Sequence, residues 1–163
     1  VTLGTANRHA QLVFAAASKA VQRLGLRAVF LTTHREQVPA RLADNVLWQD
    51  YVPLRALLAR ADAIVHHGGI GTTAEALRAG VAQLVLPLAH DQFDNAARVC
   101  ALGCGRALLT PRRQVRGLET ALRDLDESIT VRAHGAEVAE RFSTSSGVEA
   151  LCLAIESVSV VPR

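Results

Sequence analysis

Short apolar runs alternate with amphipathic stretches over the first two-thirds of the chain. Strand-like runs of apolar residues occur at positions 1–5, 27–32, 46–49, 61–66, 83–87 and 106–109. A helical period of about 3.6 residues marks the segments between them, at 10–24, 54–60, 73–79 and 95–102. Strands that alternate with helices pair in parallel and are covered on both faces. The pattern therefore predicts an α/β fold, a doubly wound, Rossmann-like parallel sheet of about six strands.

The last third of the chain carries helical patterns only. Thr110 followed by Pro111 predicts a helix start with proline at the first helical position, ahead of a helix over 115–125. Ser146 and Glu149 have the spacing of a capping box before a final helix. No run approaches the roughly 18 apolar residues of a transmembrane segment. We expect a single domain, residues 1–163, with extra C-terminal helices.

Charge and composition narrow the class of ligand. Residues 1–60 hold 8 basic and 3 acidic side chains, whereas residues 117–163 hold 4 and 8. A basic front half favours a small anionic ligand, and an aromatic content of 4% argues against nucleic acid. Three cysteines without an export signal indicate a reducing, cytoplasmic compartment. The chain lacks methionine and opens within a strand-like run, so we expect a fragment of a longer polypeptide, with a processed or tagged chain as the alternative.

The most informative stretch is the glycine-rich turn that follows the fourth strand-like run. The run ends at His66 and His67, and a helix is expected to begin near Thr72. Three glycines lie between them: Gly68, Gly69 and Gly71. Glycines let a ligand approach the backbone, and a helix start offers unpaired N–H groups with partial positive charge. This combination predicts a phosphate or diphosphate site.

Other interpretations of the same residues remain open. Thr72 and Glu75 have capping-box spacing, and Asp91 can be the N-cap of the next helix. Residues 69–74 also fit the dinucleotide pattern G-x-G-x-x-A, with Asp91 following Gly71 by 20 residues. That fingerprint belongs in the first strand–helix unit, so an NAD-dependent oxidoreductase is the less favoured alternative. No acidic pair suited to a divalent cation is seen, and we expect neither metal nor cofactor.

Taken together, these residues resemble the donor-binding signature of family 1 glycosyltransferases, most closely the bacterial branch. The resemblance extends from about Tyr51 to Leu108, and its motifs in order are His66–Thr73, Glu75, Gly80–Val81, Pro87, Asp91–Gln92 and Asn95–Ala96. Such enzymes have the two-domain GT-B fold. The resemblance implies that this chain is the C-terminal, nucleotide-sugar-binding half, and that the N-terminal acceptor domain is absent.

The resemblance also implies a role for individual positions in holding the donor's diphosphate. His67 and the backbone of Gly68–Thr72 would contact the phosphates, which places Gly69 and Gly71 at the ligand. Gly4 and Thr5, at the end of the first strand-like run, would reach the same phosphates.

The remaining donor positions follow in the same way. Glu75 would hold the ribose hydroxyls, and Asp91 and Gln92 the hydroxyls of the transferred sugar. The backbone near Val52, together with Trp48, would meet the base, which can be uracil or thymine. The other histidines outside this signature are expected to be solvated: His9, His34 and His134.

The implied activity is inverting, metal-independent transfer of a hexosyl group from a UDP- or TDP-sugar. The acceptor, a small molecule or lipid, and the general base would belong to the absent N-terminal half. We therefore expect no catalytic residue in this chain and no transfer by the chain alone. The alternative is a non-catalytic nucleotide-binding subunit of a split glycosyltransferase.

Overall fold

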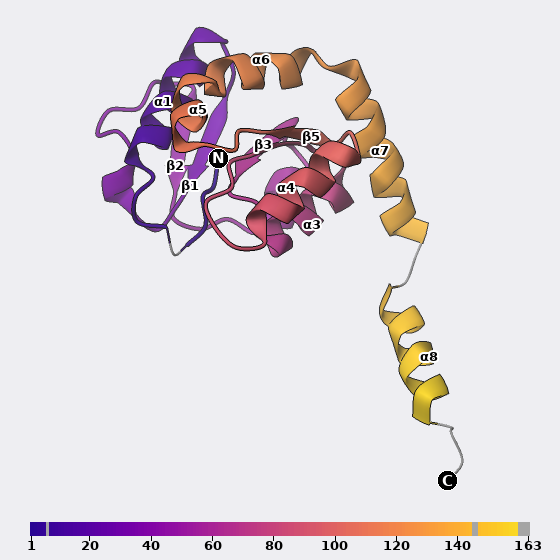
Figure 1. Ribbon diagram of the computed structural model, residues 1–163. Coiled ribbons are helices and arrows are strands. Elements are labelled where there is room, and N and C mark those ends of the chain that lie inside the picture. The colour runs from indigo at the N-terminus through magenta and orange to yellow at the C-terminus, as the bar shows by residue number, and fades with distance from the viewer. Residues whose placement is uncertain (6, 145–146, 160–163) are drawn as a thin grey trace.

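The computed structural model describes residues 1–5, 7–144 and 147–159, so the predicted cap Ser146 lies outside the described residues. Its strands are β1 (Ala28–Leu31), β2 (Val46–Gln49), β3 (Ala63–His66), β4 (Ala82–Val85) and β5 (Gly105–Ala107). Its helices are α1 (Gln11–Arg23), α2 (Leu54–Leu58), α3 (Ile70–Ala79), α4 (Gln92–Ala101), α5 (Pro111–Arg116), α6 (Leu118–Glu127), α7 (Ile129–Thr144) and α8 (Gly147–Ser159), with a 3-10 turn η1 (Arg35–Gln37). The predicted alternation is confirmed (Figure 1).

All strand pairs are parallel, and they fall into two groups, β1–β2 and β3–β4–β5. The expected first strand is reduced to a short extended segment that joins the groups. Val1 is hydrogen-bonded to β1 through its amino group and its carbonyl, and Thr2 N donates to Val65 O at 2.9 Å. The spatial order is β2, β1, residues 1–3, β3, β4, β5. Numbered along the chain, this is the 3-2-1-4-5-6 order of nucleotide-binding doubly wound sheets.

Helices cover both faces of the sheet because successive strand side chains point to opposite sides. The larger core lies under α1 and α6. In this core the ring centroids of Phe14 and Phe30 are 5.3 Å apart. On the other face, Ile64 packs with α2 and α3, and Val85 packs with α4. Figure 1 shows α1, α5 and α6 grouped together and α3 and α4 grouped apart from them. Because the strands between these two helical layers are parallel, their carboxyl ends lie along the same edge of the sheet.

The C-terminal helices differ in part from the predicted pattern. Thr110 caps α5 as predicted, since its hydroxyl accepts a hydrogen bond from Arg113 N at 3.4 Å. The single helix expected over 115–125 is two helices, α5 and α6, which meet at Gly117. Leu118, the first residue of α6, is fully buried in the larger core.

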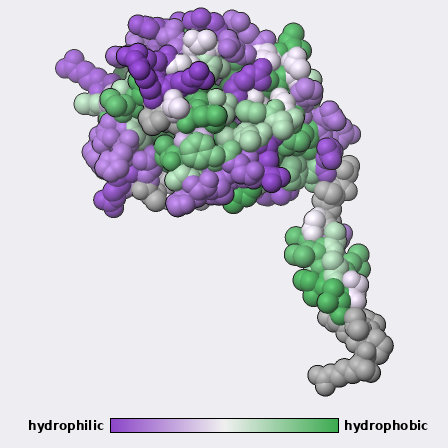
Figure 2. All heavy atoms as spheres, in the orientation of Figure 1, coloured by the Kyte–Doolittle hydropathy of each residue, from purple (hydrophilic) through white to green (hydrophobic). Residues whose placement is uncertain are grey.

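Helix α8 carries several large apolar side chains that are exposed to solvent. They are Val148, Leu151, Leu153, Ile155 and Val158, all exposed, and Figure 2 shows this outer helix uncovered. None of the helices in the described ranges combines the length and the hydropathy needed to cross a bilayer.

Candidate functional site

The predicted donor residues follow the carboxyl ends of successive parallel strands. Thr5 follows the segment 1–3, Val52 follows β2, His67 follows β3 and Asp91 follows β4. Because parallel strands end at the same sheet edge, the fold gathers these positions there. Ligands of doubly wound sheets bind at this edge, where the strand order reverses. Here the reversal lies between residues 1–3 and β3.

The glycine-rich turn leads directly into α3. The helix begins at Ile70 with Gly69 as its N-cap, two residues earlier than predicted, and no side chain caps it. The predicted capping box of Thr72 and Glu75 is therefore wrong, because both residues lie inside the helix. The N–H groups of the first turn have no intrahelical acceptor. A β-carbon at Gly71 would meet no atom of the described residues within 4 Å, so this helix start is open to a ligand.

His67 packs across the turn between two glycines. A β-carbon on Gly69 would lie 2.6 Å from its Nε2, and one on Gly4 would lie 3.0 Å from its Cε1. Burial lowers the pKa of His67, and the nearby Asp91 carboxylate opposes that shift. Its Nδ1 is buried and makes no hydrogen bond within the described residues. A buried polar atom of this kind is costly unless a ligand or water serves it.

His66 holds the glycine-rich turn through hydrogen bonds. No role for this residue was predicted from the sequence. Its Nδ1 accepts a hydrogen bond from Gly68 N at 3.2 Å, and its Nε2 lies 2.9 Å from Gln83 Oε1. The first bond requires the neutral ring with its proton on Nε2. Burial lowers the pKa of His66 to about 4. His66 is thus a neutral structural partner of the turn.

Gly68 must be glycine for two reasons. Its φ of +91° lies in the left-handed region. A β-carbon there would lie 2.9 Å from Val85 Cγ1 and 3.0 Å from Gln92 O. The turn therefore packs directly against the start of α4.

Asp91 occupies the N-cap position of α4 but makes no side-chain cap. Its Oδ2 instead accepts a hydrogen bond from Asn95 Nδ2 at 2.9 Å. The predicted N-cap position of Asp91 is therefore confirmed, but its side chain does not cap the helix. The Gln92 carboxamide oxygen accepts from Leu88 N (2.8 Å) and Ala89 N (3.2 Å). Both side chains are thereby held beside the glycine turn, each by one polar atom.

Glu75 is held by an arginine that the sequence analysis missed. Arg55 donates from Nε and Nη2 to the two carboxylate oxygens of Glu75, each at 3.0 Å. Arg78 adds a longer contact of 3.9 Å. The hydrogen bond from Arg55 lowers the pKa of Glu75 and keeps it ionised. Arg55 is the second residue of α2 and follows Val52 by three residues, so the predicted base and ribose positions are neighbours.

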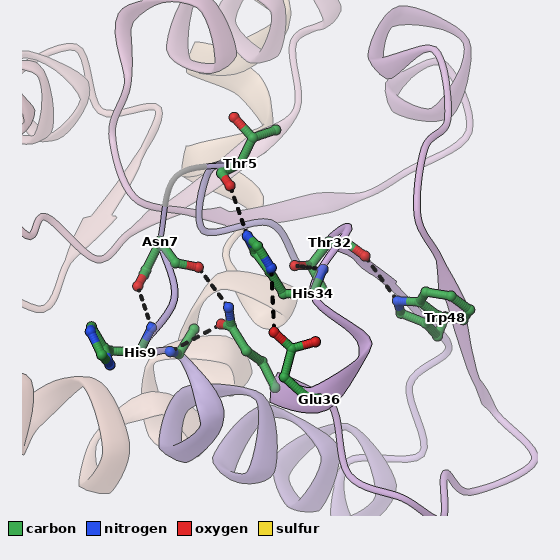
Figure 3. A network of polar contacts seen from close by, with 9 residues as sticks. Thr5, Asn7, His9, Thr32, His34, Glu36 and Trp48 are labelled. Carbon is green, nitrogen blue, oxygen red and sulfur yellow. Dashed lines mark hydrogen bonds and ion pairs between the residues drawn. The ribbon is translucent and has the colours of Figure 1, made fainter.

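Thr5 lies in a polar network at the same edge (Figure 3). The Thr5 carbonyl lies 3.1 Å from His34 Nε2, and His34 Nδ1 lies 3.4 Å from Glu36 Oε1. His34 was expected to be solvated, which is wrong, since its side chain is only 16% exposed. His34 is shielded from solvent because its ring contacts the Thr5 carbonyl, and this contact links the loop after residues 1–3 to the loop after β1.

Trp48 is held by two contacts near the carboxyl end of β2. Its Nε1 donates to Thr32 O at 3.0 Å (Figure 3), and the Arg35 guanidinium lies 5.5 Å above its ring. The indole N–H is thus already engaged, although the residue stays half-exposed. Val52 is half-buried in the connection before α2, and its backbone remains the candidate base contact.

A cavity of about 470 Å³ lies at the opposite, amino-terminal edge of the strands, and none of the predicted donor residues lines it. Across residues 1–5, 7–144 and 147–159, no three His, Cys, Asp or Glu side chains gather closely enough to hold a metal ion. The candidate site is an open surface formed by the turn, the start of α3 and the start of α4.

Sequence comparisons identify the family. Residues 25–150 match the model of the erythromycin biosynthesis protein CIII-like C-terminal domain. Over 111 residues the chain is 42% identical to aklavinone 7-beta-L-rhodosaminyltransferase of Streptomyces galilaeus, covering 67% of this chain and 25% of that protein. It is 37% identical over 106 residues to a sterol 3-beta-glucosyltransferase of Kluyveromyces lactis, covering 65% and 9%. The chain thus spans a quarter or less of these relatives.

Structural comparisons agree. Spinosyn rhamnosyltransferase SpnG complexed with thymidine diphosphate superposes with a TM-score of 0.82 at 25% identity, covering 95% of this chain and 44% of that one. The glycosyltransferase SnogD from Streptomyces nogalater gives a TM-score of 0.71 at 29% identity, covering 88% and 38%. The expected α/β fold and the resemblance to the C-terminal domains of family 1 glycosyltransferases are both confirmed. The chain belongs to the erythromycin biosynthesis protein CIII-like C-terminal domain family, within the GT-B glycosyltransferases of family 1.

Proposed function

We propose that this chain binds the diphosphate of a nucleotide-sugar donor at the start of α3. One observation carries the proposal: His67, with a buried and unpaired Nδ1, lies against Gly69 at a helix start that is open to ligands among the described residues. Unpaired N–H groups and the helix dipole favour an anion at this point. The TDP complex of the similar rhamnosyltransferase supports a nucleoside diphosphate as the ligand.

The chemistry of transfer explains why such a site is useful. When the bond between sugar and diphosphate breaks, negative charge grows on the departing phosphate. N–H groups at Gly69–Thr72 and the His67 imidazole stabilise that charge without a metal ion. Preorganised donors of this kind need no rearrangement as the charge develops. In this proposal the transfer inverts the anomeric centre and needs no cofactor.

Other residues of the site hold the rest of the donor. Glu75 receives the ribose hydroxyls, and the backbones of Thr5 and Val52 meet the phosphates and the base. Asp91 and Gln92 receive hydroxyls of the hexose, since one offers an acceptor and the other an amide donor. The donor is a UDP- or TDP-sugar. All these groups lie on loops and helix starts at one sheet edge.

The rest of the reaction belongs to another domain. The acceptor, a small molecule or lipid, and the general base come from an N-terminal domain, and the 163-residue chain alone transfers no sugar. The three free cysteines fit a reducing, cytoplasmic compartment.

The proposal is tested by calorimetric titration of the chain with UDP, TDP and GDP. His67→Ala should weaken every nucleotide by a similar factor of about 10 or more, because a hydrogen bond to a charged group contributes about 1.5–3 kcal/mol. His134→Ala, an exposed histidine of α7, is the matched control and should change no affinity. Equal binding by the wild type and His67→Ala would refute the proposal.

A further inference from the structure

Asn95 connects two parts of the candidate site, the glycine-rich turn at Gly68 and the carboxylate of Asp91. It lies in the first turns of α4 and is only 7% exposed. Its Nδ2 donates to the Gly68 carbonyl and to Asp91 Oδ2, both at 2.9 Å. One amide group therefore uses its two hydrogens on the glycine turn and on the carboxylate beside it.

The packing around Asn95 leaves little room for Gly68 and Asp91 to move relative to each other. Gly68 already packs against Gln92 O so closely that a β-carbon would lie 3.0 Å away. Asp91 makes no helix cap, so the bond from Asn95 is what fixes its Oδ2. Because Asn95 uses both Nδ2 hydrogens on Gly68 and Asp91, its amide group has no hydrogen left to donate to a ligand. Its effect on a ligand must pass through Gly68 and Asp91.

We propose that Asn95 is a positioning residue that holds Asp91 in register with the diphosphate turn. This inference rests on the proposed function, and it adds how the hexose and the diphosphate of one donor are held at a fixed separation. Asn95 contributes most when the ligand carries both groups. A nucleotide without its sugar gains little from the placement of Asp91.

The chemistry of the amide makes the role testable with a substitution of nearly equal size. Asn95→Asp keeps the shape but replaces the Nδ2 amide group, which donates two hydrogens, by one acceptor oxygen. The carboxylate introduced by this substitution would face the Gly68 carbonyl and the Asp91 carboxylate, and both contacts become repulsive. Asn95→Ser keeps one donor and should give a smaller effect. Asn45→Asp is the matched control, because Asn45 Nδ2 donates to Leu26 O (2.6 Å) at the opposite edge of the sheet.

The experiment compares UDP with UDP-glucose and TDP with TDP-glucose by calorimetry on the 163-residue chain. The readout is the ratio of the two affinities, which a general loss of stability does not change. In the wild type the sugar nucleotide should bind more tightly than the nucleotide. Asn95→Asp and Asp91→Ala should each reduce this ratio about tenfold, and the double variant should lose no more than either single variant.

The outcomes separate this inference from the proposed function. If the wild type binds neither nucleotide, the proposed function fails and the role of Asn95 fails with it. If nucleotides bind and His67→Ala weakens them, but Asn95→Asp and Asn95→Ser keep the wild-type ratio, the proposed function stands and this inference is overturned. An additive double variant also overturns it.

Discussion

The imidazole of His67 fills the place that a β-carbon on Gly69 would occupy, since that carbon would lie 2.6 Å from Nε2. Gly69 has φ −61° and ψ 138°, a conformation open to any residue. Space, and not backbone strain, therefore requires glycine at this position. The glycine and the histidine act as one unit at the start of α3.

Gly69→Ala should displace the His67 ring without unfolding the chain. The atom in the way is the far end of a side chain, so it can move. We expect nucleotide affinity to fall about tenfold while the melting temperature changes by only a few degrees, measured by calorimetry and thermal unfolding. Gly147→Ala, at the start of α8 where a β-carbon meets nothing within 4 Å among the described residues, should leave the affinity unchanged. If Gly69→Ala bound nucleotides with the wild-type affinity, the position of the His67 ring would not matter for binding.

Gly71→Ala should raise stability and lower affinity at the same time. Gly71 lies within α3, where alanine is favoured over glycine by roughly 0.5–1 kcal/mol. Its new β-carbon meets open space among the described residues, so any loss of nucleotide binding must come from a clash with the ligand. Urea unfolding and calorimetry on the same sample check both changes. Unchanged affinity would place the phosphates elsewhere.

Arg55→Ala should weaken nucleotides but not inorganic pyrophosphate. Arg55 restrains Glu75, the proposed ribose ligand, through two hydrogen bonds of 3.0 Å, and pyrophosphate has no ribose. Because the pair is exposed, we expect little change in melting temperature. Arg98→Ala, which removes a similar exposed pair with Asp94 (2.7 Å) on α4, is the control. Equal losses for pyrophosphate and nucleotides would contradict the assigned contact.

The stability of the chain should fall as the pH falls from about 6.5 towards 4. Burial lowers the pKa of His66 from 6.5 to about 4, so in this window the unfolded chain binds more protons than the folded one. The contribution is roughly 3 kcal/mol at neutral pH. The Val1 amine, whose pKa burial lowers to about 5, titrates in the same direction at pH 5–8. The Val1 contribution is the same in His66→Asn, so it cancels when the denaturation curves of this variant and the wild type are compared. A difference in their free energies of unfolding that does not change with pH would contradict the assignment.

Much of the fold was predictable because it follows from local periodicity. The alternation of strands and helices indicated the fold class, and Thr110 marked its helix start. The start of α3 was misplaced because Gly69 can serve as an N-cap, a role that the pattern assigned to Thr72. The glycine turn itself was found because glycines and histidines stand next to each other in the chain.

The supporting residues of the site were not predictable in the same way. His34 contacts Thr5 across 29 positions, and Asn95 contacts Gly68 across 27. Arg55 and Glu75 are 20 positions apart. Such contacts depend on how the strands are ordered in space, which local patterns do not encode. Asn95 did stand within the recognised motif, so its presence was visible although its function was not.

The amide spectrum of the ¹⁵N-labelled chain during titration with TDP or UDP tests the central claim most directly. If N–H groups at the start of α3 bind the diphosphate, the largest shifts should occur at Gly69, Ile70, Gly71 and Thr72. Inorganic pyrophosphate should reproduce them. The account is contradicted if these four amides stay in place while others move, such as Val29 and Asp62 beside the cavity at the opposite edge.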